Sequence, residues 1–383
     1  MKGIPRSVCL ILAGCSLLVQ CNKDPDFLPE DPIGIDDQAF LHALIANRVD
    51  INGDSLISFE EAELISSLNL NRRNITQVKG IEAFVNLTHL NIEYNSITSL
   101  DLSNNPALIY LHCSDNQLTE LNLTNNKEIL EIQCWGNNLP ELDVSQCTHC
   151  SVLACGDNRL ITLDLSKLGQ LKELWCGRNQ IQQLDLSLNP ALETLFCRTN
   201  QIRTLNMEGC IKLKKIYSAR NQLSSLDVSN HPLLQNLDCS DNQLSGIDLS
   251  NNPELEYVHC DNNQLTYLDV SNNSVLWRIS CINNQLSNLD VSNCPDLVTL
   301  KCDYNQITEL DLASNMSLGE LRAGYNQLNQ LNLSGNPRLG RITLSGMPTL
   351  LEVCVSTLFL SNEWISVDTE GSPNVFFTTE CSQ

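Results

Sequence analysis

The most informative feature of this 383-residue chain is a four-residue motif that recurs every 21 residues. The motif is Leu-Asp-Leu-Ser or a close variant, and it begins at Leu100, Leu121, Leu142, Leu163, Leu184, Leu205, Leu226, Ile247, Leu268, Leu289, Leu310 and Leu331. Repeats of roughly 20 to 29 residues with regularly spaced leucines are typical of solenoids, in which each unit packs only against its neighbours. The sequence therefore predicts one elongated domain.

The residues inside one unit narrow this prediction to a family of solenoids. Leu108, Leu111, Cys113, Asn116 and Leu118 follow the spacing L-x-x-L-x-C-x-x-N-x-L. With this spacing the chain resembles the leucine-rich-repeat superfamily, and especially bacterial surface members such as the cysteine-ladder internalins and repeat lipoproteins. The resemblance implies a curved parallel β-sheet on the concave face, a mostly extended or turn-like convex face and a small helical N-terminal cap.

We expect five segments along the chain. Residues 1–21 resemble a lipoprotein signal peptide, and residues 22–35 form a polar tether. A helical cap with an EF-hand-like loop occupies residues 36–67, the 21-residue repeats occupy 68–350, and a C-terminal cap occupies 351–383.

The N-terminus predicts export. Lys2 and Arg6 precede an apolar run over residues 8–19, which is too short to span a bilayer and fits a signal peptide. Cys15 ends a Leu-Ala-Gly-Cys sequence that resembles a lipobox, whereas Cys21 is followed by a Lys/Asp-rich stretch that resembles a lipoprotein tether. Either cysteine is a candidate for lipidation, and an ordinary secretory signal is the alternative. We expect an exported, lipid-anchored protein at the bacterial outer membrane or cell surface.

The formal net charge of −22 partly reflects the repeat itself. One position of the unit holds Asp or Asn throughout, at Asp101, Asn122, Asp143, Asp164, Asp185, Asn206, Asp227, Asp248, Asp269, Asp290, Asp311 and Asn332. Such side chains accept a backbone N–H in a tight turn, so we interpret this column as structural. The remaining acidity argues against a nucleic-acid partner, which would need a basic surface.

Half of the 18 cysteines fall at one position of the unit, where a small side chain is required. These are Cys113, Cys134, Cys155, Cys176, Cys197, Cys239, Cys260, Cys281 and Cys302, with Ser218 and Ala323 in the same position of other units. A position that accepts Cys, Ser or Ala selects for size rather than for a bond, which predicts a ladder of buried thiols.

Two other pairs of cysteines lie outside this position. Cys147 and Cys150 resemble half of a zinc site, but no second pair has metal spacing, so we expect no metal there. By resemblance to related bacterial repeat proteins, in which a cysteine pair flanks a tryptophan, we expect Cys354 and Cys381 to be bonded around Trp364.

The segment from residue 50 to residue 61 resembles an EF-hand loop. Its expected calcium ligands are Asp50, Asn52, Asp54, the carbonyl of Leu56, Ser58 and the carboxylate of Glu61. Position six holds Ser55 instead of the usual glycine, which makes the sharp turn more costly. The alternatives are a structural calcium site and a metal-free cap. Helices are expected on both sides, over residues 36–48 and 60–67.

Alternation along the strands predicts which side chains face the open concave surface. The outward row is Asn91, His112, Gln133, Ala154, Trp175, Phe196, Tyr217, Asp238, His259, Ser280, Lys301, Arg322 and Thr343. Residues 167–220 carry nine Lys/Arg and only four Asp/Glu. Aromatic and arginine side chains are typical of binding hot spots. The predicted partner-binding residues are Trp135, Trp175, Phe196, Tyr217, Arg178, Arg198, Lys215 and Arg220.

The residues of this surface are suited to two kinds of partner, and they do not support a catalytic site. The leading hypothesis is a protein ligand, and the alternative is a glycan captured as a nutrient. Asp238, His259 and Ser280 have the residue types of a hydrolase triad, but adjacent strands would separate them by about 4.8 Å, which is too far for its hydrogen bonds. We therefore expect no enzymatic activity and no cofactor other than calcium.

Overall fold

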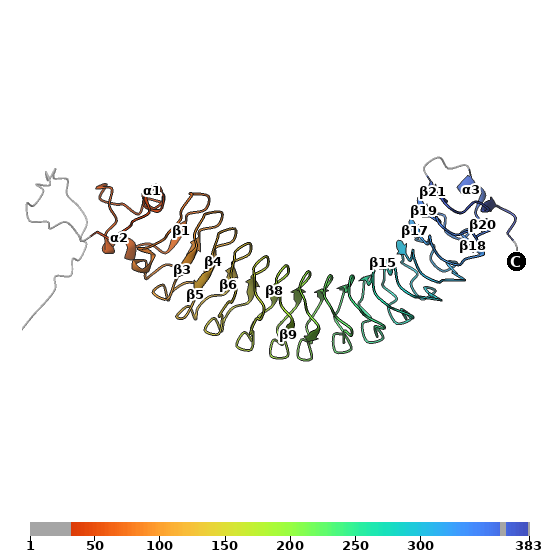
Figure 1. The fold of residues 1–383 in the computed structure, drawn as a ribbon, viewed down its shortest axis with the longest axis horizontal. Helices are drawn as coiled ribbons and strands as arrows, with labels where there is room; N and C mark the ends of the chain where they lie inside the picture. The colour runs from red at the N-terminus through yellow and green to blue at the C-terminus, as the bar shows by residue number, and fades with distance from the viewer. Residues whose placement is uncertain (1–31, 361–364, 382–383) are drawn as a thin grey trace, which may run out of the picture.

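The computed structural model describes residues 32–360 and 365–381 of the chain. Figure 1 shows an open arc with a cap at each end, as expected for a leucine-rich-repeat solenoid. In these described residues, no helix has the length and apolar character needed to cross a membrane. The signal peptide, with Cys15 and Cys21, and Trp364 lie outside them.

A parallel sheet lines the concave side, and its fifteen described strands stack in chain order. The strands are β1 (Ser67–Asn69), β2 (His89–Asn91), β4 (Tyr110–His112), β6 (Glu131–Gln133), β7 (Val152–Ala154), β8 (Glu173–Trp175), β10 (Thr194–Phe196), β12 (Lys215–Tyr217), β13 (Asn236–Asp238), β14 (Tyr257–His259), β15 (Arg278–Ser280), β16 (Thr299–Lys301), β17 (Glu320–Arg322), β19 (Arg341–Thr343) and β21 (Ser366–Asp368). The predicted fold class is confirmed, and β1 and β21 extend the sheet beyond the strands that carry the predicted outward row, from Asn91 to Thr343.

The convex side is built from turns and short parallel pairs. These are β3 (Ser99–Asp101) with β5 (Glu120–Asn122), β9 (Gln183–Asp185) with β11 (Thr204–Asn206), and β18 (Gln330–Asn332) with β20 (Glu352–Cys354) and β22 (Phe376–Thr378). The aspartate column forms turns here: Asp185 Oδ1 accepts a hydrogen bond from the backbone N–H of Ser187 at 3.0 Å. The N–H and hydroxyl of Ser187 hold the pKa of Asp185 below its usual value. The column is therefore structural, as predicted.

The core is a stack of leucines with the predicted ladder of thiols. Leu111, Leu174 and Leu195 are fully buried, and so is every cysteine of the ladder. These cysteines are free thiols. Burial raises the pKa of Cys134 to about 12, so the thiol stays protonated and behaves as a small apolar side chain.

An asparagine ladder closes the turn that leaves each concave strand. Asn179 is representative: its Oδ1 accepts from the N–H of Leu160 at 3.0 Å, and its Nδ2 donates to the carbonyl oxygens of Cys155 and Cys176 at 3.0 and 3.1 Å. One amide thus satisfies backbone groups of two adjacent units.

A second buried asparagine column, not anticipated from the sequence, lies nearer the convex side. Its members are Asn105, Asn126, Asn189, Asn252, Asn273, Asn315 and Asn336. Each donates to two backbone carbonyls of the preceding unit; Asn189 Nδ2 reaches Leu165 and Leu168 at 3.0 and 2.9 Å. Their Oδ1 atoms have no hydrogen-bond partner among the described residues. Cys210 fills the same position, and its thiol donates to the corresponding carbonyls.

The N-terminal cap consists of α1 (Gln38–Ala46), α2 (Phe59–Glu63) and the short 3₁₀ helix η1 (Ile81–Ala83). Asp37 caps α1 by accepting from two backbone amides, and its second oxygen accepts from Thr76 and Gln77 of the first repeat. Burial opposes ionisation of Asp37, but these hydrogen bonds outweigh it and lower its pKa to about 2. The second helix was predicted too long, because the chain enters β1 at Ser67.

The C-terminal cap continues the solenoid. It contains α3 (Thr357–Leu360), and β21 and β22 extend the concave and convex sheets respectively. The structure joins Cys354, at the end of β20, to Cys381 by a disulfide with Cα atoms 5.3 Å apart. The last turn is thereby attached to the stack.

Candidate functional site

The candidate site is the row of outward side chains along the concave sheet. The sheet register pairs Ala154 with Trp175, Trp175 with Phe196, Phe196 with Tyr217, and Tyr217 with Asp238. The alternation argument therefore identified the row residue by residue. Its role in binding stays a prediction.

Trp175, Phe196 and Tyr217 form one continuous ring stack. The centroids of Trp175 and Phe196 are 3.7 Å apart, and those of Phe196 and Tyr217 are 4.3 Å apart, with planes inclined by 12° and 9°. Both faces of Phe196 are therefore covered by neighbouring rings. A sugar ring that binds through its flat side would find no free face there, and only the stack's edges and its two ends are accessible.

The predicted cations divide into two pairs. Arg178 lies 3.4 Å from Asp157 and Arg220 lies 3.6 Å from Asp241, so a nearby carboxylate offsets each of these charges. Arg198 and Lys215 are exposed and make no ion pair with any described residue. These two cations, beside Phe196 and Tyr217, are therefore available to a partner.

Trp135 lies in the adjoining row and covers the backbone of the next unit. A Cβ atom added at Gly156 would come within 2.7 Å of the indole ring, so only glycine leaves room for the indole in this position. Trp135 keeps 40% of its surface exposed, close to the 39% of Trp175.

His259 and Ser280 both contact Asp261, which is not one of the three residues of triad type. His259 Nε2 lies 2.7 Å from Asp261 Oδ2, and Ser280 Oγ donates to Asp261 Oδ1 at 2.7 Å. His259 Nδ1 lies 3.0 Å from the hydroxyl of Tyr257 and 3.6 Å from Asp238 Oδ1. Serine and histidine thus both bond to Asp261, an arrangement in which the histidine cannot take the serine proton.

Burial and two neighbouring carboxylates act in opposite directions on the pKa of His259. Burial disfavours its charged form, but the hydrogen bond and charge of Asp261, together with the charge of Asp238, outweigh burial and raise the His259 pKa. Because His259 is hydrogen-bonded to Asp261 and lies close to Asp238, its arrangement suits a structural role rather than general base catalysis. Asp261 follows the row residue His259 by two positions, so the same alternation predicts that its side chain is also directed outward.

The EF-hand-like segment uses its oxygens internally. Glu61 Oε1 accepts from the N–H groups of Ile51 and Asn52, and Oε2 accepts from the N–H and hydroxyl of Ser58, which forms a capping box for α2. No three His, Cys, Asp or Glu side chains gather to hold a metal anywhere in residues 32–360 and 365–381.

In this conformation the carboxylates of the loop are engaged in hydrogen bonds within the cap. Asp50 and Asp54 likewise accept from backbone amides inside the loop, so their oxygens are directed at the chain itself. Ser55 adopts φ 69°, the left-handed conformation that glycine takes without cost. Calcium binding therefore stays a prediction, and it requires that Glu61 leave four hydrogen bonds.

The cysteine pair considered for zinc is buried in the core. Cys147 and Cys150 are fully buried, and the thiol of Cys150 donates to the carbonyl oxygen of Val152. They replace an asparagine and a leucine of other units.

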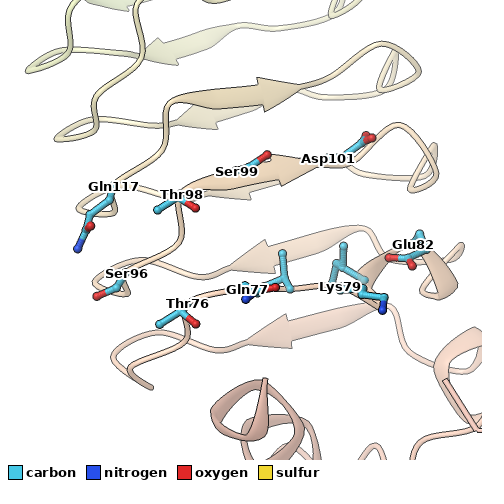
Figure 2. A pocket seen from close by; sticks show the side chains of 11 residues that line it. Thr76, Gln77, Lys79, Glu82, Ser96, Thr98, Ser99, Asp101 and Gln117 are labelled. Atoms are coloured by element: carbon cyan, nitrogen blue, oxygen red, sulfur yellow. The ribbon is translucent and has the colours of Figure 1, made fainter. Parts of the chain in front are cut away.

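A cavity of about 620 Å³ lies away from the concave row, between the first units (Figure 2). Hydroxyl and amide side chains such as Thr76, Ser96, Thr98 and Gln117 line it, and no aromatic residue does. None of the predicted partner-binding residues belongs to it.

The geometry defines a leucine-rich-repeat protein, and the comparisons identify its family. The functional domain of InlJ from Listeria monocytogenes, which includes a cysteine ladder, is 32% identical in sequence; the match covers 83% of this chain and 76% of that chain, with a TM-score of 0.76. The chain belongs to the internalin-type leucine-rich-repeat family.

Two further solved structures share the fold at lower identity. The internalin InlF of Listeria monocytogenes is 21% identical, with 94% of this chain and 100% of that chain covered and a TM-score of 0.65. The leucine-rich-repeat protein LIC12759 of Leptospira interrogans is 20% identical, with 84% and 93% covered and a TM-score of 0.69. No protein-family model and no curated protein matches the chain.

Proposed function

We propose that this protein is a non-enzymatic recognition protein that binds a protein partner through its concave face. The observation that carries the proposal is the aromatic stack of Trp175, Phe196 and Tyr217, flanked by the exposed cations Arg198 and Lys215, which form no ion pair within the described part of the chain. Rigid aromatic groups beside arginine are the usual anchors of protein interfaces. The stacked strands hold these groups in place before binding, so little conformational entropy is lost.

The glycan alternative has less support. Stacking covers both faces of Phe196 and one face each of Trp175 and Tyr217, which leaves few ring faces for a sugar, and charged groups that suit a protein surface lie beside the stack. A protein ligand remains the favoured partner.

The test measures binding to a panel of purified extracellular proteins and, separately, to a panel of glycans. The triple variant Trp175→Ala, Phe196→Ala, Tyr217→Ala is compared with a convex control, Ile161→Ala, Leu188→Ala, Ile211→Ala, whose side chains are also exposed. We expect a protein ligand whose affinity falls at least tenfold in the triple variant and stays unchanged in the control. Equal affinity of both variants, or binding to glycans alone, would refute the proposal.

We further propose that the protein is exported and held at the cell surface by a lipid on Cys15 or Cys21. The support is the basic and apolar N-terminal sequence described above. Metabolic labelling with a fatty acid tests the anchor: label should disappear in only one of Cys15→Ala and Cys21→Ala. Label that persists in both variants would refute the anchor. So would a wild-type chain that is secreted without any label.

A further inference from the structure

The aromatic stack ends at Trp175, where one ring face is left open. Phe196 covers the face directed toward β10, with the ring centroids 3.7 Å apart. The other face is therefore directed toward β7, where the residue paired with Trp175 is Ala154. Because alanine carries only a methyl group, no large side chain of that row covers the indole.

Two carboxylates flank this open face. Glu131 and Glu173 pair with Val152 on either side of β7, two residues before the row of Ala154. Glu173 Oε2 accepts a hydrogen bond from the indole N–H of Trp175 at 3.2 Å, and Glu131 Oε1 lies 3.1 Å from Nε2 of His112. Both carboxylates are half-buried, so neighbouring groups hold them in position beside the indole.

Trp135 closes the opposite flank. Its ring lies over Gly156, which is two residues beyond Ala154 on the same chain segment, a separation of about 7 Å in an extended strand. Ala154 is thus surrounded by two exposed indoles and two carboxylates. We call Glu131, Trp135, Ala154, Glu173 and Trp175 the tryptophan–glutamate site.

The charge of the solenoid changes sign at this site. Residues 113–166 contain two Lys/Arg and eight Asp/Glu, whereas residues 167–220 contain nine Lys/Arg and four Asp/Glu. Arg198 and Lys215, which are exposed, lie on the basic side. Three strand spacings, about 14 Å, separate the strand of Ala154 from that of Lys215.

We propose that the tryptophan–glutamate site binds an arginine side chain of the protein partner. A planar guanidinium stacks on the free face of Trp175 and donates to Glu173 and Glu131, whereas a carboxylate would be repelled there. The same partner presents carboxylates to Arg198 and Lys215, whose chain segments lie about 10 and 14 Å from the strand of Ala154. This assignment rests on the proposed function, since it specifies the chemistry of the ligand at the same concave face.

The test uses N-acetyl-arginine amide as the probe and N-acetyl-citrulline amide, its uncharged analogue, as the control. The full chain is labelled with ¹⁵N, and the indole N–H signals are followed during titration. We expect the arginine probe to shift the signals of Trp135 and Trp175 saturably, at least tenfold more tightly than citrulline. An equal response to both probes would overturn the assignment.

Matched variants locate the effect. The double variant Glu131→Gln, Glu173→Gln should weaken the arginine response about tenfold, and Ala154→Leu, which fills the space above the methyl group, should abolish it. Glu120→Gln on the convex side should leave it unchanged. A response unaffected by the double variant, with circular dichroism unaltered, would overturn the assignment.

The two proposals fail in different ways. If the alanine triple variant keeps its protein ligand, the concave face is not the binding surface, whatever the probe does. If the triple variant loses the ligand but the Glu131→Gln, Glu173→Gln variant binds it as tightly as the wild type, recognition by the concave face stands and the arginine assignment alone is wrong.

Discussion

The indole of Trp175 and the phenyl ring of Phe196 lie face to face on adjacent strands, with centroids 3.7 Å apart and planes inclined by 12°. Tyr217 extends the same stack on the far side of Phe196. The central ring thus makes two contacts within the sheet while its edge remains open to a partner. The contribution of Phe196 to stability and its proposed contribution to binding can be separated experimentally.

Replacement of Phe196 by alanine should destabilise the solenoid. Each stacked pair is worth about 0.5–1.5 kcal/mol beyond the area it buries, so two lost pairs should lower the free energy of unfolding by about 1–3 kcal/mol. Urea unfolding measures the change. Thr194→Ala on the same strand is the control and should cost no more than about 0.5 kcal/mol. Equal costs would show that stacking adds nothing to stability.

Calcium should have little effect on stability. Both oxygens of Glu61 are already bonded within the cap, so an ion must displace these bonds before it is held. We expect millimolar calcium to change Tm by less than about 2 °C, which for a chain of this size is less than about 1.6 kcal/mol. Magnesium serves as the control. A larger rise with calcium only, lost in Asp54→Asn, would show that the loop rearranges into a metal site.

His259 should make stability depend on pH. Its folded pKa is raised by Asp261 and Asp238, against the opposing effects of burial and of the nearby Arg278, while Tyr257 contacts its Nδ1. The stabilisation is therefore complete below the unfolded pKa of about 6.5 and is lost as the pH rises through the folded pKa.

The measurement is the difference in Tm between the wild type and His259→Gln from pH 5 to pH 8.5. We expect the difference to shrink as the pH rises. In Asp261→Asn, an NMR titration should find the His259 pKa lower than in the wild type, because burial then meets less opposition. A difference in Tm that is independent of pH would contradict the ion pair.

Sequence periodicity predicted the strands because the same steric demands recur in every unit. Leu195 and Cys197 had to face inward and Phe196 outward once the register was known, and the structure places them so. Contacts between units follow from this register, which is why the aromatic row was predictable residue by residue.

The 21-residue period of the sequence could not predict contacts that depend on side-chain rotamers. The engagement of Asp261 by both His259 and Ser280 requires knowing which way each side chain turns. The end of α2 at Glu63 is decided by tertiary context, since Leu68 is buried as part of β1. The periodicity of a helix does not reveal that the same residues are needed for a strand, because tertiary packing overrides local propensity.

The two asparagine columns should differ sharply in their tolerance of cysteine. Asn179 both accepts from the N–H of Leu160 and donates to two carbonyls, whereas Asn189 only donates and leaves its oxygen without a partner among the described residues. Cys210 shows that a thiol can supply the donor in the second column. Asn189→Cys should therefore be nearly neutral in urea unfolding. Asn179→Cys leaves the buried N–H of Leu160 unsatisfied and should cost about 1–3 kcal/mol. Equal costs would mean that the acceptor half of the first ladder does not contribute to stability, and that shape alone selects asparagine in both columns.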